Sequence, residues 1–291
     1  MRRLAPFFLL SITAIWGWTF VLVKEGTQFV GPFTFLAARF LLATAVLVLL
    51  FWRVLRQVKR PTLGRGAAIG LALFGGYFFQ TWGLAYTSAT KSGLLTGLSV
   101  VFVPFLASLA ARERVRLAHW AGAALGASGL ATFVLARSGV SPFNPGDLLT
   151  LFGAVAFAAH LILVDRFVRK DDYRVLLVIQ VAVVAVLSVA GTLAFETMPH
   201  SWPAKLVEGV VITGLLATAL SFYLMNRFQE HSTAAYTAIL FTMEPVFAGL
   251  FGFLLLGETL TWLQGAGGLL ILAGMVLVPL VKQRTRRSAR G

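Results

Sequence analysis

Cysteine is absent from this chain of 291 residues, and acidic residues and histidines are scarce, with 11 Asp and Glu and 4 His. Without Cys the protein cannot form disulfides, bind zinc through thiolates or use thiol chemistry. The His residues are too scattered to form a metal site or a catalytic triad with a serine and an acid, so we expect no metal, no cofactor and no enzyme. These residues are His119, His160, His200 and His231.

Charged residues are also few. They make up 12% of the chain, against about 25% in an ordinary soluble domain, while 58% of the residues are hydrophobic and the mean hydropathy is +0.84. A water-soluble core of this length cannot hide that much apolar surface, so the sequence predicts an all-α integral membrane protein. At roughly 20 apolar residues per crossing, the chain has room for about ten transmembrane helices with short connections.

Apolar stretches separated by polar or turn-forming residues place these spans along the chain. The first half contains spans near 6–23, 33–51, 66–86, 92–111 and 117–136. The second half contains spans near 147–165, 175–195, 209–226, 232–256 and 262–281. Met1-Arg2-Arg3 precedes the first stretch as in a signal peptide, but no small-residue cleavage site follows, so we interpret that stretch as the first span.

The distribution of Lys and Arg predicts the orientation of the chain. Its 25 basic residues lie in short clusters between apolar stretches, which is typical of membrane topology and not of a nucleic-acid surface. If the N-terminus is cytoplasmic, 20 of the 25 fall in cytoplasmic loops and tails, and only Lys24, Lys91, Arg137 and Lys205 fall on the opposite side. We therefore predict that both termini are cytoplasmic and that nucleic acid is not a partner.

The two halves of the sequence are similar to each other. Residues 86–135 align without a gap on residues 231–280, and this alignment superimposes two helix pairs together with Glu113 on Glu258. We divide the chain into residues 1–140 and 141–291, each with five predicted helices. Because five is an odd number, the second copy has to insert upside down, which gives the inverted repeat of many secondary transporters.

The order of short motifs resembles the drug/metabolite transporter superfamily, specifically its ten-helix permeases of the EamA type. The resemblance covers the whole chain. The matching segments in the first half are Ala14-Ile15-Trp16-Gly17, Thr19-Phe20, Ala38-Arg39-Phe40 and Ala85-Tyr86-Thr87-Ser88-Ala89. In the second half they are Met243-Glu244-Pro245-Val246-Phe247-Ala248, Leu256-Gly257-Glu258 and the glycine-rich last span.

This resemblance implies alternating access through a central cavity, usually for the export of metabolites, amino acids or drugs. We therefore predict a secondary active exporter of a small metabolite, amino acid or organic ion, with protons as the candidate coupling ion. A facilitated-diffusion uniporter of the same fold is the alternative within transport, and a membrane-embedded enzyme is the alternative from another class. No Gly-x-x-x-x-Gly-Lys-Ser/Thr motif is present to support ATP use. The expected location is the plasma membrane, which is the inner membrane in a Gram-negative bacterium.

Ionisable side chains within spans are costly in a bilayer and are therefore candidates for function. Glu244 lies near the middle of its span, where we expect either a coupling site for a proton or cation or a neutral, hydrogen-bonded carboxyl. Arg39 keeps its charge, so it either holds a substrate carboxylate or pins its helix through Glu244 or backbone carbonyls. His160 is either a proton relay or a hydrogen-bonded structural residue.

Polar and aromatic residues at helical spacing extend the predicted cavity lining. These are Trp16 and Phe20 in the first span, Tyr77 and Gln80 in the third, and Tyr223 and Asn226 in the eighth. Ser99 aligns with Glu244 in the repeat, so we expect the two to approach each other across the pseudo-two-fold axis. The alternative for each of these residues is a structural role in packing or at the interface.

Glycines at small-xxx-small spacing indicate close helix packing and not a ligand site. Examples are Gly93 and Gly97, Gly122 and Gly126, and the glycines of the last span. Glycine-rich fifth and tenth spans can pack within one subunit or between two. Because ten helices enclose a cavity without a partner, we expect a monomer, with a dimer as the alternative.

Overall fold

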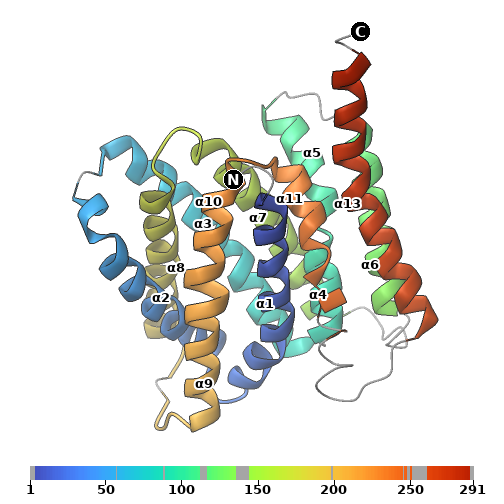
Figure 1. The fold of residues 1–291 in the computed structure, drawn as a ribbon. Coiled ribbons are helices and arrows are strands. Elements are labelled where there is room, and N and C mark those ends of the chain that lie inside the picture. Colours follow the sequence, from blue (N-terminus) through green and yellow to red (C-terminus); the bar gives the residue numbers. More distant parts are fainter. Residues whose placement is uncertain are drawn as a thin grey trace.

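The computed structural model describes residues 4–56, 58–87, 89–111, 117–135, 144–197, 199–244, 246–247, 250 and 261–288. Within these residues every regular element is a helix (Figure 1). In chain order these are α1 (Ala5–Gly26), α2 (Pro32–Leu55), α3 (Arg60–Tyr86), α4 (Ala89–Gly97), α5 (Ser99–Ala111), α6 (Leu117–Leu135), α7 (Pro145–Phe167), α8 (Tyr173–Phe195), α9 (Ala204–Ile212), the π-helix η1 (Thr213–Leu220), α10 (Ser221–Gln229), α11 (Ala234–Phe241) and α13 (Trp262–Ser288).

Proline and short polar residues set the starts of these helices. Proline occupies one of the first two positions of α1, α2, α3 and α7, where the missing N–H breaks no helical hydrogen bond. At α7 the Asn144 side chain accepts from the Asp147 backbone N–H, and the Asp147 carboxylate accepts from the Asn144 N–H. At α8 the Asp172 side chain accepts from the Arg174 N–H, and at α11 the Thr233 side chain accepts from the Tyr236 N–H.

The described helices are apolar enough for a bilayer. Six segments have the length and hydropathy to cross a membrane, and two shorter apolar helical stretches cover Leu95–Leu109 and Gly265–Leu277. Large apolar side chains cover the outer surface, including Leu49 at 75% exposure and Phe195 at 79%. A backbone that is hydrogen-bonded within helices and an apolar outer surface are what a lipid environment requires. The six long segments are Ala5–Gly26, Pro32–Leu55, Arg60–Tyr86, Pro145–Phe167, Tyr173–Phe195 and Ala204–Gln229.

Helices overlie the spans that the sequence predicts, with two interruptions in the described part of the chain. The predicted span 92–111 is divided at Leu98 into α4 and α5. The predicted span 232–256 begins as α11 and is interrupted by a turn at Thr242 and Met243, and much of its remainder lies outside the described residues. The two interruptions correspond to each other, because the offset that aligns the two sequence halves places Leu98 on Met243.

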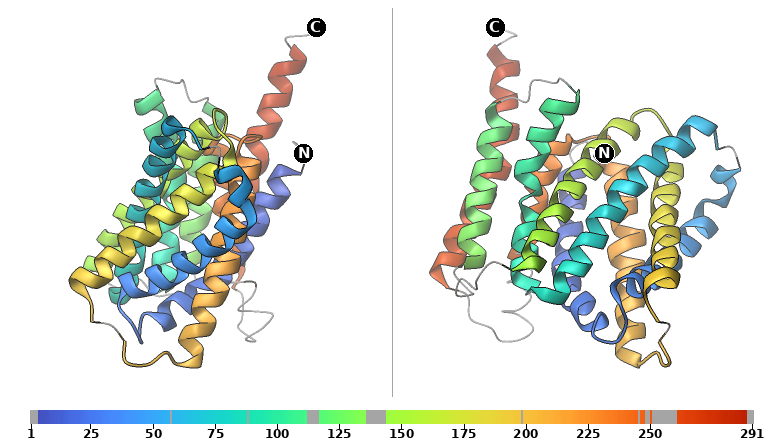
Figure 2. Two further views of the ribbon diagram at one scale, coloured as in Figure 1. Left: turned by 90° about the vertical axis from the view of Figure 1, so that its left-hand side faces the viewer. Right: turned by 180° about the vertical axis from the view of Figure 1, so that it is seen from behind.

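Helices from the two predicted halves pack against each other throughout the bundle. α3 lies along α7 and α8, α2 lies along α8, and α6 pairs with α13 at one side (Figure 2). α1 contacts α9, η1, α10 and α11, so it lies among helices of the second half. The start of α1 and the end of α13 lie at the same end of the bundle (Figure 1), an arrangement that an even number of crossings would give.

The α6–α13 pair is held together by backbone contact at glycines. A Cβ atom added at Gly129 would meet the carbonyl of Gly267 and the backbone of Ile271, and one at Gly274 would meet the carbonyl of Gly122. Lipid tails are as apolar as the helices, so close packing replaces the hydrophobic effect as the force that joins them. The prediction that the glycines of the last span serve packing fits these contacts at Gly267 and Gly274.

We expect Gly129→Ala to lower the stability of the folded protein in detergent by about 1–3 kcal/mol, because the new methyl group collides with the backbone of α13. Gly265→Ala is the matched control, since nothing lies within 4 Å of its added Cβ and Ala favours the helix. Apparent melting temperatures from fluorescence-detected size exclusion measure both changes. Equal melting temperatures for the two variants would contradict the proposed role of Gly129.

A polar cluster ties the start of α3 to the connection between α7 and α8. Thr62 Oγ1 donates to Asp171 Oδ1 at 2.6 Å, and Arg65 Nη1 donates to Asp171 Oδ2 at 2.8 Å. Burial opposes ionisation of this carboxyl, but the two hydrogen bonds and the nearby charges of Arg65 and Lys170 outweigh it and hold the pKa of Asp171 below its usual 3.8. The ionised form therefore stabilises the folded state.

Because the pKa of Asp171 is lowered by folding, the stabilisation that it provides decreases at acidic pH. It is complete above the unfolded pKa of 3.8 and is lost as the pH falls through the lower folded value. We expect Asp171→Asn to reduce the melting temperature at neutral pH, and the difference from the wild type to shrink as the pH falls through the lowered folded pKa. Thermal melts across this pH range test the prediction, and a difference that stays constant with pH would contradict it.

Candidate functional site

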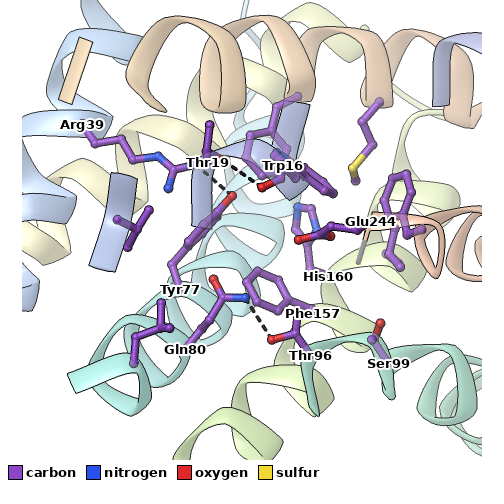
Figure 3. Close-up of a pocket in the computed structure, with 17 residues that line it drawn as sticks. Trp16, Thr19, Arg39, Tyr77, Gln80, Thr96, Ser99, Phe157, His160 and Glu244 are labelled. Carbon is purple, nitrogen blue, oxygen red and sulfur yellow. Dashed lines mark hydrogen bonds between the residues drawn. The ribbon is translucent and has the colours of Figure 1, made fainter. Parts of the chain in front are cut away.

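A cavity of about 80 Å³ lies inside the bundle and is lined by both sequence halves. Its volume suits several water molecules and is small against the roughly 300–1,000 Å³ of pockets for drug-sized ligands. Figure 3 shows its polar and aromatic lining. The lining residues are Trp16, Thr19, Val23, Arg39, Tyr77, Gln80, Leu84, Thr96, Gly97, Ser99, Phe157, His160, Leu161, Phe222, Met225, Phe241 and Glu244.

Most of the residues that the sequence singled out as candidates line this one cavity. They come from six segments of the chain that are distant in sequence. They are Trp16 on α1, Arg39 on α2, Tyr77 and Gln80 on α3, Ser99 on α5, His160 on α7 and Glu244 after α11. The cavity therefore brings together every ionisable candidate.

Two of the described candidates, Tyr223 and Asn226, fall outside this lining. Tyr223 stacks on Phe51 of α2, with ring centroids 5.9 Å apart, and does not line the cavity. Asn226 is fully buried and hydrogen-bonded to Gln180, so it reaches the cavity only through other residues. The side chain of Phe20 lies outside the described part of the structure.

Arg39 is a buried cation at one side of the cavity, with 3% of its surface exposed. Its Nε donates to Thr218 Oγ1 at 2.7 Å, and its Nη2 lies 3.3 Å from Tyr77 Oη and 3.4 Å from the Ala217 carbonyl. The guanidinium carbon also lies 4.8 Å from the centre of the Tyr77 ring, within cation–π range. No ion pair joins it to Glu244 or to another acid among the described residues.

The π-helix η1 supplies the oxygens that Arg39 uses. A π-helical turn bonds each residue five positions back, and such turns often occur at functional sites. Thr218 Oγ1 donates to Thr213 O at 2.9 Å, which leaves its lone pairs directed to Arg39 Nε. The Ala217 carbonyl accepts from Trp16 Nε1 at 2.8 Å as well as from Arg39. One wide turn therefore positions side chains from both α1 and α2.

Glu244 is the acid of the cavity, at the side away from Arg39 (Figure 3). It follows directly on the turn that interrupts the helix after α11. Within the described structure no hydrogen bond or ion pair engages its carboxyl group. Ser99 begins α5 at the corresponding interruption of the first half and lines the same cavity. An acid in a membrane interior with no partner of its own is available to a proton or a ligand.

His160 begins a chain of buried hydrogen bonds that leads away from the cavity. Its Nε2 lies 2.7 Å from Gln180 Oε1, Gln180 Nε2 donates to Asn226 Oδ1 at 3.0 Å, and Asn226 Nδ2 donates to the Phe222 carbonyl at 2.9 Å. Since the last acceptor is a carbonyl, each amide has one orientation that satisfies the chain. In neutral His160 the proton is therefore on Nε2, which leaves Nδ1 as the acceptor.

Two buried glutamines, one inside this hydrogen-bond chain and one without partners, should affect stability in opposite directions when each is replaced by leucine. Gln180→Leu breaks two buried hydrogen bonds and should destabilise the protein by about 1–3 kcal/mol. Gln229 is also fully buried, yet neither of its polar side-chain atoms has a hydrogen-bond partner in the described structure. Gln229→Leu should therefore be neutral or stabilising, because it removes the cost of unsatisfied groups. Thermal melts in detergent decide, and destabilisation by both substitutions would contradict the prediction.

Aromatic side chains form the remaining wall of the cavity. Trp16 packs edge-on against Phe241 at 5.1 Å, and Tyr77 packs edge-on against Phe157 at 5.2 Å. Phe157, Phe222 and Phe241 are absent from the candidates chosen by sequence, because a phenylalanine within an apolar span carries no polar signal. Thr96 was also missed, although it accepts a 3.0 Å hydrogen bond from Gln80 Nε2.

Metal binding finds no support in the arrangement of ligand side chains. No group of three or more His, Asp or Glu residues lies close enough to hold an ion among the described residues. The cavity instead offers one guanidinium, one carboxyl, one imidazole and several aromatic faces. Such a lining can bind a small organic solute through charge, hydrogen bonds and apolar contact.

Comparison with known proteins agrees with this fold. A solved crystal structure with 24% sequence identity has the same fold, with a TM-score of 0.81 over 98% of this chain and 99% of that one. The apolar helical bundle is that of a multi-pass membrane protein, and the family match given next makes its class that of a transporter. More narrowly, the chain belongs to the EamA-like transporter family, whose model matches residues 3–135 and 144–280.

Relatives of similar length carry transporter names. An uncharacterized transporter of Archaeoglobus fulgidus is 33% identical over 96% of this chain and 87% of its own length. A probable amino-acid metabolite efflux pump of Salmonella typhimurium is 26% identical over 100% of this chain and 99% of its own length. An uncharacterized inner membrane transporter of Escherichia coli K12 is 27% identical over 97% of this chain and 93% of its own length. The predicted family and the multi-pass membrane location are thus confirmed.

Proposed function

We propose that this protein is a proton-coupled exporter of a small organic solute, which it moves by alternating access through the central cavity. The observation that carries this proposal is the Glu244 carboxyl group, which lines the cavity without an ion pair or hydrogen bond among the described residues. An acid in this position can take up a proton from one side of the membrane and release it to the other. Proton binding and solute binding then share one site.

The two helix interruptions support alternating access. Secondary transporters built from inverted repeats hold their substrate near the bilayer midplane, at discontinuous helices that belong to both halves. Here the interruptions at Leu98 and at Thr242–Met243 place Ser99 and Glu244 in the same cavity. We propose that the halves 1–140 and 141–291 rock against each other about this site. Because the present volume of about 80 Å³ is small, we propose that a solute enters the cavity after helices move apart.

The direction of transport and the orientation are part of the proposal. The excess of Lys and Arg in the loops at one end favours ten crossings with both termini in the cytoplasm. The Salmonella relative is named as an efflux pump for amino-acid metabolites, which favours export of compounds of that kind. Because ten helices can enclose a cavity without a partner, we propose that a monomer suffices for transport.

Transport measurements with the purified protein in liposomes test the coupling role of Glu244. We expect the wild type to accumulate a member of a labelled panel of amino acids and organic cations when a pH gradient is imposed. One proton per solute across one pH unit supplies about 1.4 kcal/mol, which supports a concentration ratio of about 10. Glu244→Gln should only equilibrate the same solute, because the amide cannot carry the proton.

Glu208→Gln is the matched control, since Glu208 is an exposed carboxylate on α9 outside the cavity. It should accumulate solute like the wild type. Equilibration without accumulation by the wild type and all variants alike would indicate the runner-up, a uniporter in which Glu244 is structural. Full accumulation by Glu244→Gln would assign coupling to another group.

A further inference from the structure

Arg39 is a buried permanent charge without a counter-ion in the described structure. The guanidinium stays protonated under all ordinary conditions, so burial cannot neutralise it. Isolated ions are strongly disfavoured in a low-dielectric interior unless they are paired. The neutral oxygens of Thr218, Tyr77 and Ala217 supply hydrogen bonds but no negative charge.

The hydrogen bonds of Arg39 are also incomplete on the side of the cavity. A guanidinium has five N–H donors. The bond from Nε is short, the two from Nη2 are long at 3.3 and 3.4 Å, and Nη1 has no described partner. Arg39 lines the cavity itself, so its unused donors can be reached from there.

Glu244, the acid that shares the cavity, does not act as the counter-ion of Arg39. Glu244 lies away from Arg39, with Tyr77 drawn between them in Figure 3. No ion pair within 4.0 Å joins the two described side chains. A pair between them would also leave no group to carry the proton that the proposed coupling needs.

We propose that Arg39 binds the carboxylate group of the transported solute. A carboxylate would accept two parallel hydrogen bonds from the guanidinium and supply the missing negative charge. The body of the solute would then lie toward Trp16, Phe157 and Phe241, which favours a carboxylic acid with an apolar or aromatic portion. This inference rests on the proposed transport function and specifies the chemical class of its substrate.

Matched sets of compounds that differ only in the carboxylate test the inference. One set is leucine, leucinamide and isoamylamine, and another is phenylalanine, phenylalaninamide and phenethylamine. Binding to purified wild-type protein is followed by fluorescence of the tryptophans, one of which, Trp16, lines the cavity. Because binding requires no transport, a failure of the Arg39 assignment is separated from a failure of transport.

We expect the wild type to bind the carboxylates about 10- to 100-fold more tightly than their amides, as for a charge-assisted hydrogen bond worth about 1.5–3 kcal/mol. Arg39→Gln should abolish this preference while amide binding stays within about threefold. Arg39→Lys should keep the charge but lose the two-bond geometry, so its preference should be intermediate. Arg53→Gln, the same substitution at an exposed site of α2, should behave as the wild type.

Inhibition of solute counterflow by the same compounds, without a membrane potential, gives the transport readout. Equal binding of carboxylates and amides by the wild type would overturn the inference and leave transport intact. If Arg39→Gln fails to fold, the inference is still tested by the preference of the wild type for carboxylates over amides and by the reduction of that preference in Arg39→Lys. Carboxylate binding without counterflow of any compound would support Arg39 as an anchor but count against the proposed transport function.

Discussion

The rest of the cavity depends on the hydrogen bonds that Arg39 of α2 and Trp16 of α1 make to the π-helix η1. Arg39 reaches from α2 to Thr218 and Ala217, while Trp16 of α1 donates to the same Ala217 carbonyl. In lipid an unsatisfied polar group costs several kcal/mol, so these bonds fix where α1 and α2 meet the second half. The irregular turn is tolerated because a π-helix still bonds its backbone groups within the helix, and its polar residues Thr213 and Thr218 are buried.

Around this junction the bundle is held by close contact and by buried polar chains. Glycines bring α6 and α13 to backbone distance at Gly129 and Gly274. The chain from His160 through Gln180 to Asn226 joins α7, α8 and α10 and orients the imidazole. Both devices replace the hydrophobic effect, which cannot drive helices together in a solvent as apolar as their own side chains. A rigid frame of this kind suits a site in which a few charges have to be held in place.

The cavity combines a permanent cation and an acid that remain apart. Arg39 offers a permanent positive charge and unused donors, and Glu244 offers an ionisable group at an interrupted helix. Because the two groups form no ion pair, one can hold the solute while the other carries the proton in the exchange proposed above. The aromatic wall of Trp16, Phe157 and Phe241 supplies the apolar contact between them.

The sequence by itself determined the helical membrane class, the family, the positions of the described helices within a few residues and most of the polar cavity lining. These follow from hydropathy and from the high cost of charge in lipid, which makes residues such as Arg39 and Glu244 conspicuous. Tertiary structure alone decided that Asn226 bonds to Gln180 outside the lining, that Phe157 and Phe241 complete it, and that Arg39 is held by a π-helical turn. These facts depend on how each helix is rotated about its axis and on how closely helices far apart in the sequence approach one another. The periodicity of a sequence reports neither the rotation nor the distance.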